Sequence, residues 1–233
     1  MTTAAPHFAS LVDQLANVRR WNDERGWGFP EWELEALETT PANHASPLVV
    51  DVLAVYLPGR AERKMNGVQW TCSEMWELAA RRQPHAWCWD ERMAAPKPVR
   101  LLEGIGHRPG VRRVTLDLAA NWNRRTGVRP LDVRNLTSAS AEVLAAAAHF
   151  PEWVRAMDGD RVPFACLGGY QLTVPSYETW RHIVCLSWSH FNRRINLSDN
   201  WADYYQDRFA SPVLLAAPVS AAPFPDRPAG LSG

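Results

Sequence analysis

The hydrophobic pattern of this chain changes near Arg161, and that change restricts the folds that it can adopt. Before Arg161 most apolar residues recur at the spacing of amphipathic helices, whereas beyond it short apolar runs are separated by Gly, Pro, Ser and Asn residues. Helices followed by an antiparallel-looking β region favour an α+β fold over alternating βαβ units. We therefore predict an α+β fold, with helices mainly in the N-terminal two-thirds and an antiparallel β region at the C-terminal end.

Helical patterns are clearest at the start and in the middle of the chain. Residues 8–25 place apolar side chains at helical spacing up to Gly26. A second helix is predicted from Pro30, because proline is tolerated at a first helical position. Further helices are predicted at residues 71–82, at 138–150, and from 151 to the Asp158-Gly159 pair.

The string FPEW occurs twice, at 29–32 and at 150–153. Each copy is interpreted as a helix start, with Pro in the first turn, Glu near the positive N-terminal end and Trp facing the core. The residues around the two copies differ, so they do not indicate a domain repeat. We expect Trp32 and Trp153 both to be buried, because large aromatic side chains dominate core burial.

Strand patterns are of two kinds. Residues 47–57 (PLVVDVLAVYL) are rich in β-branched residues and are bounded by Pro and Pro-Gly, which predicts a buried strand. Residues 111–118 (VRRVTLDL) alternate apolar and polar side chains, as a strand with one solvated face does. Shorter strands are predicted within residues 162–175, 182–188 and 193–201.

Composition limits the domain count and the classes of partner. The chain has 233 residues, of which 46% are hydrophobic, so residues 1–211 are expected to form one domain with a substantial core. Residues 212–233 are a Pro/Ala-rich tail that we expect to be flexible, although 213–215 could end a strand. Lys and Arg together number 25, as do Asp and Glu, so no nucleic acid or membrane partner is expected. The N-terminus resembles no signal peptide and no apolar run would span a membrane, which predicts a cytoplasmic protein.

We expect this protein to bind no cofactor. The cysteines and some acidic residues nevertheless leave metal or redox alternatives open. Cys166 and Cys185 fall on predicted strands and could face each other, either as buried thiols or as a redox or copper pair. Calcium prefers several oxygen ligands at short range, and the acids near residue 200 could either bind it or be solvated. The oxygen-bearing residues concerned are Asp199, Asn200, Asp203 and Asp207.

Residues 188–212 (WSHFNRRINLSDNWADYYQDRFASP) crowd polar side chains between a few aromatic ones. That mixture suits a contact surface, because Tyr and Trp provide rigid contact area while Ser, Asn and Arg provide adaptable hydrogen bonds. The candidate ligand-binding residues are Trp188, His190, Asn192, Arg193, Asn196, Ser198, Asp199, Asn200, Trp201, Asp203, Tyr204, Tyr205, Asp207 and Arg208.

The stretch LAAAAHFPEWVRAMDGDRVPFACLGGYQLTVP, followed by polar strands and RFASP, resembles a family of uncharacterised bacterial proteins. In that family a constant core precedes a C-terminal stretch that differs between members, an arrangement similar to the variable proteins of diversity-generating retroelements. Over residues 101–212, this resemblance implies a C-type-lectin-like fold, related to the formylglycine-generating-enzyme fold. It also implies ligand-binding residues diversified by adenine-directed mutagenesis, among which Trp188 and Trp201 would be fixed scaffold positions.

We therefore expect a non-catalytic protein that presents residues 188–208 to a protein or carbohydrate partner. Tyr204 and Tyr205 are the expected anchors, whereas Trp188 and Trp201 either anchor the loop or contact the ligand. One alternative is a metal- or thiol-dependent enzyme related to the formylglycine-generating fold, with Cys166 or Cys185 near a metal. The other alternative is a structural or assembly protein.

Overall fold

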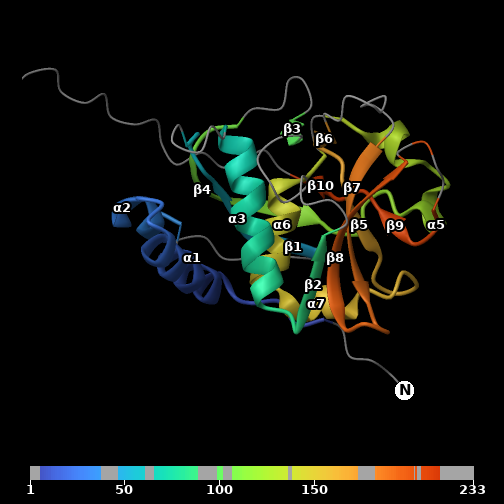
Figure 1. Ribbon diagram of the computed structural model, residues 1–233, viewed down its shortest axis with the longest axis horizontal. Helices are drawn as coiled ribbons and strands as arrows, with labels where there is room; N and C mark the ends of the chain where they lie inside the picture. Colours follow the sequence, from blue (N-terminus) through green and yellow to red (C-terminus); the bar gives the residue numbers. More distant parts are fainter. Residues whose placement is uncertain are drawn as a thin grey trace, which may run out of the picture.

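Helices and strands both contribute to the structure, which confirms the predicted α+β class (Figure 1). The computed structural model describes residues 6–37, 47–60, 66–88, 99–101, 107–135, 138–172, 182–201, 203 and 206–215. The helices are α1 (Leu11–Arg25), α2 (Glu31–Glu35), α3 (Gly67–Arg81), α5 (Asn123–Thr126), α6 (Ala141–His149) and α7 (Pro151–Ala156), with a 3₁₀ turn η2 at Pro130–Val133.

The strands of the described residues form three sheets. The first has the order β1-β4-β10, the second β2-β8-β7-β5-β9, and the third pairs β3 with β6. The C-terminal sheet is mixed: β5, β7 and β8 are antiparallel, while the edge strands β2 and β9 run parallel to their neighbours. The strands are β1 (Val49–Tyr56), β2 (His85–Cys88), β3 (Val99–Leu101), β4 (Gly110–Asp117), β5 (Phe164–Leu167), β6 (Tyr170–Leu172), β7 (His182–Ser189), β8 (Arg194–Trp201), β9 (Phe209–Ala210) and β10 (Val213–Leu214).

Local capping explains where α1 begins and ends. The Ser10 side chain accepts a hydrogen bond from the Asp13 backbone, and the Asp13 carboxylate accepts one from the Ser10 backbone, which forms a capping box. At the other end Gly26 has φ 62°, a left-handed conformation that glycine adopts without a Cβ penalty. The predicted end at Gly26 is therefore confirmed, while the helix begins after Phe8.

Helix α6 lies between the two halves of the molecule (Figure 1) and packs against α3, β1 and β5. All nine of its residues are buried. A helix that is buried along its whole length requires neighbours on every side, and its run of alanines lets those neighbours approach closely. One continuous cluster of buried apolar side chains consequently extends from Leu15 of α1 to Leu197 of β8.

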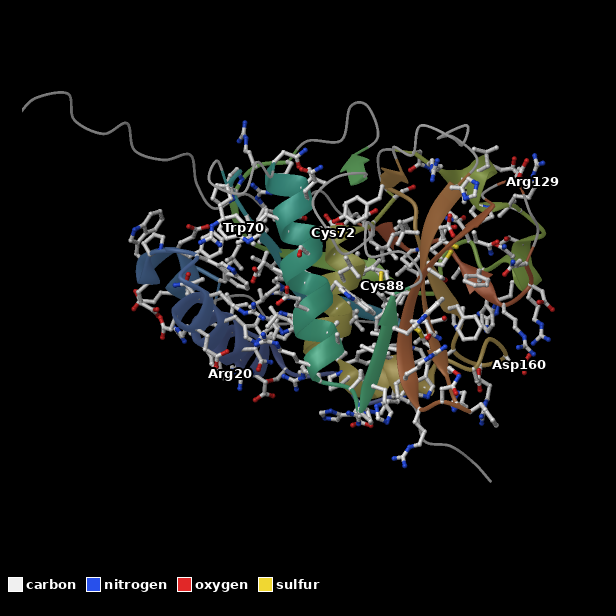
Figure 2. All side chains as sticks on the ribbon, in the orientation of Figure 1. Arg20, Trp70, Cys72, Cys88, Arg129 and Asp160 are labelled. Carbon is white, nitrogen blue, oxygen red and sulfur yellow. The ribbon has the colours of Figure 1, made fainter. Side chains whose placement is uncertain are left out.

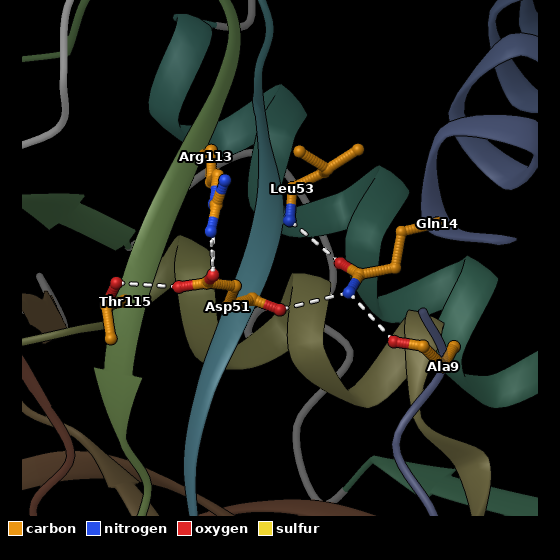
Figure 3. Close-up of polar contacts among 6 residues, drawn as sticks. All are labelled: Ala9, Gln14, Asp51, Leu53, Arg113 and Thr115. Carbon is orange, nitrogen blue, oxygen red and sulfur yellow. Dashed lines mark hydrogen bonds and ion pairs between the residues drawn. The ribbon is translucent and has the colours of Figure 1, made fainter. Parts of the chain in front are cut away.

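Strand β1 lies at the edge of its sheet, yet it is buried from Val50 to Tyr56. Its outer backbone groups therefore need partners other than water. Gln14 of α1 supplies two of them: its Nε2 donates to the Asp51 carbonyl at 3.0 Å, and its Oε1 accepts from the Leu53 amide at 2.9 Å (Figure 3). The same Nε2 also donates to the Ala9 carbonyl at 3.1 Å.

Two other helices supply further hydrogen-bond partners along this edge of β1. His149 of α6 donates from Nε2 to the Leu53 carbonyl at 3.1 Å. The Thr71 hydroxyl of α3 accepts from the Leu57 amide at 2.8 Å, just beyond the end of β1. Side chains from α1, α3 and α6 thus take the place of a neighbouring strand.

One expectation needs correction. Trp32 is 56% exposed, and Leu34 is the buried residue of the five-residue helix α2, whereas Trp153 of α7 is buried as predicted. The first FPEW copy starts its helix at Glu31, with Pro30 as the N-cap, and the second starts at Pro151, so the two tryptophans occupy different positions in their helices. The alternative that residues 213–215 end a strand is confirmed at Val213 and Leu214, which pair with β4; residues 216–233 lie outside the described part.

None of the described helices is both long enough and apolar enough to cross a membrane.

Replacing Gln14 with Leu should destabilise the fold by about 2–4 kcal/mol, because it leaves buried backbone groups of β1 without hydrogen bonds. Gln14→Glu should cost more, since it directs a carboxylate at two carbonyl oxygens. Chemical denaturation measures both. Val12→Ala is the matched control, because Val12 lies on the same helix and is 76% exposed. Equal effects of Gln14→Leu and Val12→Ala would contradict this role.

His149 should make the fold acid-sensitive. Burial lowers the pKa of His149 from 6.5 to about 3, so the folded protein keeps the ring neutral while the unfolded chain binds a proton below pH 6.5. This contribution to stability is complete above pH 6.5 and is lost as the pH falls toward 3. Between pH 7 and pH 5 the loss is about 2 kcal/mol.

The measurement is urea unfolding at both pH values, in the natural protein and in His149→Gln. The variant no longer titrates at this position, so its stability should change less between pH 7 and pH 5. The same change in both proteins would assign the acid sensitivity to other groups.

Candidate functional site

Strands β7 and β8 form an antiparallel hairpin that contains most of the expected site residues. Trp188 faces Ile195 and Ser189 faces Arg194 across the ladder, which leaves residues 190–193 as the turn. Successive side chains of a strand point to opposite faces, so the segment is divided between an inner and an outer face.

The inner face belongs to the core. Trp188 is only 7% exposed and packs in the same apolar cluster as Ile195 and Leu197. Of the two roles expected for Trp188, this burial favours the one in which it anchors the segment over contact with a ligand. Asp199 also lies on this face, where its Oδ2 is 2.8 Å from Nδ1 of the buried His182. The Trp201 side chain is outside the described part.

The outer face carries the polar residues of the hairpin, together with the buried Ile183 and Cys185, which are the register partners of Asn200 and Ser198. Asn196, Ser198 and Asn200 of β8 are partly exposed there. The register adds further partly exposed side chains that the sequence reasoning missed. We define the outer hairpin face as Ser187, Ser189, Arg194, Asn196, Ser198 and Asn200.

The neighbouring strand β2 extends this face with an aromatic ring. Trp87 is the register partner of Asn196, and it is 37% exposed. The Arg194 guanidinium lies over the Trp87 ring, 5.0 Å from its centroid, and Arg194 Nε donates to Asn196 Oδ1 at 2.9 Å. A planar cation stacked on an indole is held in place while its outer side stays available.

The turn projects an apolar side chain into solvent. Phe191 is 96% exposed, the highest value among the large hydrophobic residues that the structure describes. The turn around it is fixed: His190 Nε2 donates to the Met157 carbonyl at 3.0 Å, and the Asn192 amide donates to Ser189 Oγ at 3.3 Å. Arg193 is exposed and has φ 49°, a left-handed conformation required by the tight reversal. We call residues 190–193 the hairpin tip.

The expected ligand-binding residues that follow β8 do not belong to the outer hairpin face. Asp207 and Arg208 are exposed, but they precede β9, which β5 and β7 separate from β8 in the sheet. Their backbone is anchored, since the Asp207 carbonyl accepts from Trp122 Nε1 at 2.9 Å. Asp203 is partly exposed, and Tyr204 and Tyr205, the expected anchors, lie outside the described residues.

The cysteines and the acidic residues give two further results. Cys166 and Cys185 face each other with their Sγ atoms 3.5 Å apart, as the predicted strands had suggested. Burial, together with its thiol partner, raises the pKa of Cys185 well above its usual value. Within the described ranges, no three His, Cys, Asp or Glu side chains converge in a way that could hold a metal ion.

Part of this geometry has a visible sequence signal. Residues 194–200 alternate Arg, Asn, Ser and Asn with Ile, Leu and Asp, which separates the outer residues from the inner ones. Val184, Leu186 and Trp188 share the same period, which assigns Trp188 to the inner face. Phe191 sits between two strand patterns, where a turn is expected. By contrast, no local signal pairs Trp87 with β8, because that contact joins distant segments.

The chain was compared with models of known protein families, with curated proteins and with solved structures. None of the three comparisons finds a match.

Proposed function

We propose that this chain is a non-catalytic binding protein that presents the hairpin tip and the outer hairpin face to a protein or carbohydrate partner. The observation that carries the proposal is Phe191, whose ring is almost fully solvated on a turn held by hydrogen bonds. Burying such a ring against a partner contributes about 2 kcal/mol. Because the turn is already ordered, little conformational entropy is lost on binding.

The chemistry around Phe191 supports a contact surface. The outer hairpin face provides hydroxyl and amide groups that both donate and accept hydrogen bonds. Trp87 provides a flat aromatic surface on which a sugar ring or an apolar side chain can stack. An aromatic anchor beside adaptable polar groups is the usual composition of binding surfaces in which a few residues supply most of the energy.

The positive charge of the hairpin favours one class of partner. Residues 187–198 contain Arg193, Arg194 and His190 but no Asp or Glu. A partner that carries negative charge where it meets this surface is therefore favoured. Acidic polysaccharides and acidic protein surfaces both satisfy this requirement, and both belong to the proposed classes.

We further propose that the chain is related to the variable proteins of diversity-generating retroelements and has a C-type-lectin-like fold. The two faces of the hairpin support this idea. Asn196, Ser198 and Asn200, which changes at adenines in Asn-type codons could produce, lie on the outer face. Trp188, which adenine changes in Asn-type codons cannot produce, lies in the core.

The encoding DNA tests this relationship. We expect a nearby near-copy of the codons for residues 188–212 that differs mainly at adenines, together with a reverse transcriptase gene. Sequencing the surrounding locus decides the matter. If both are missing, the proposed diversification is wrong, although binding by the hairpin could still be correct.

The triple variant Phe191→Ser, Arg193→Ser and Asn196→Ala should abolish binding and leave the thermal midpoint nearly unchanged, because the first two side chains are exposed and the third is partly exposed. Binding is measured on immobilised alginate, on neutral dextran and against a display library of acidic peptides. Alginate binding or selected peptides, in each case lost in the triple variant, would support the proposal.

Trp32→Ser is the matched control, because Trp32 is an exposed aromatic residue on α2, far from the hairpin in sequence. It should leave binding intact. If the triple variant retains full binding, or if Trp32→Ser removes it, the binding surface lies elsewhere.

A further inference from the structure

Two thiols lie directly opposite each other in the C-terminal sheet. Cys166 of β5 and Cys185 of β7 are register partners, and their Sγ atoms are 3.5 Å apart. Opposed Cα atoms of antiparallel strands lie about 4.5–5.5 Å apart, and disulfides join Cα atoms separated by about 4.4–6.8 Å. The backbone therefore already has a separation that a disulfide can span, and side-chain rotation can bring the sulfur atoms together.

The surroundings of the pair are distinct from the main core. Cys166 and Cys185 are 1% and 0% exposed, and with Ile183 they form a small separate cluster against which the partly buried Phe209 packs. Phe209 belongs to the two-residue edge strand β9, so a short element covers the sulfur atoms. Arg134 lies close enough to interact electrostatically with both thiols, and it is fixed by hydrogen bonds to the carbonyls of Tyr170 and His182.

These features distinguish the pair from an ordinary pair of buried thiols. A nearby guanidinium stabilises the thiolate through which cysteine reacts. The facing thiol provides an immediate second reactant, so that an oxidised sulfur can be captured before it is oxidised further. Cys72 on α3 and Cys88 on β2 (Figure 2) occupy different elements from this pair.

We propose that Cys166 and Cys185 are a redox modification site that forms a reversible disulfide when the protein is oxidised by hydrogen peroxide. One cysteine attacks a peroxide oxygen as its thiolate, the O–O bond breaks, and the departing hydroxide takes up a proton as water. The sulfur of the second cysteine then attacks the resulting sulfenic acid. The S–S bond forms, the S–O bond breaks, and a second water leaves with the proton of the second thiol. Overall, two thiols and one peroxide give one disulfide and two waters.

Burial makes this reaction conditional on access to the sulfur atoms. The pKa of Cys185 is raised well above its usual value by burial, by Cys166 and by Asp199, while Arg134 acts in the opposite direction. The pair therefore stays reduced until the cover formed by β9 opens. Phe209 controls this access because it packs directly on the cluster. This inference does not depend on the proposed binding function.

The test uses the unsubstituted full-length protein. The reduced protein is treated with hydrogen peroxide and unfolded in urea, its remaining thiols are blocked with iodoacetamide, and its peptides are analysed by mass spectrometry without reduction. We expect a cross-linked peptide that joins Cys166 to Cys185, while Cys72 and Cys88 remain outside any cross-link. Treatment with a thiol reductant should remove the cross-link.

Variants then test the mechanism. Cys166→Ser and Cys185→Ser should each abolish the cross-link and leave the remaining sulfur oxidised to the sulfinic or sulfonic acid, whereas Cys72→Ser should retain it. Phe209→Ala should accelerate cross-linking several-fold, and Phe191→Ala, at the distant hairpin tip, should not. The proposal is overturned if the natural protein forms a cross-link to Cys72 or Cys88 instead. It is also overturned if Cys166 and Cys185 remain uncrosslinked after Cys88 has fully reacted.

Discussion

The buried edge of β1 is the constraint on which the rest of the fold depends. An edge strand normally meets water along its outer side, but β1 is covered by helices and its outer amides and carbonyls must find partners within the protein. Gln14, Thr71 and His149 provide them from α1, α3 and α6. Each of these helices is therefore held by directional hydrogen bonds as well as by apolar packing, which fixes where along β1 it can lie.

Helix α6 connects the buried edge of β1 to the sheet that contains the hairpin. The helix contacts β1 on one side and β5 on another, and β5 pairs with β7, whose inner residues join the same apolar cluster. The outer hairpin face is thus carried by a strand pair whose inner face packs in the main core. Trp188 and Asn196 are close in sequence but lie on opposite faces of the hairpin, because Trp188 is buried in the core and Asn196 is partly exposed.

Sequence reasoning predicted the elements that local pattern determines. Periodicity predicted helices at 8–25, 71–82 and 138–150, which the structure has at 11–25, 67–81 and 141–149, and it also predicted the strands β1, β4, β7 and β8. The stop at Gly26 was predicted as well, whereas the capping box at Ser10, which sets the start of α1, was not. Contacts between distant segments could not be predicted in this way. The parallel pairing of β2 with β8, which brings Trp87 to Asn196, depends on tertiary packing. Trp32 and Trp153 start from the same FPEW string and differ in burial for the same reason.

The role of Gln14 has a consequence for self-association. Its amide occupies the donor and acceptor that another strand would use to pair with β1 (Figure 3). An open strand edge is a template for intermolecular β-pairing, which leads to domain swapping or fibrils, and natural proteins cover such edges. Helix α1 therefore covers this edge and prevents it from pairing with another chain. Separation of α1 from the sheet would therefore expose the apolar strand VVDVLAVY to pairing with a second chain, which ties resistance to aggregation to the docking of this one helix.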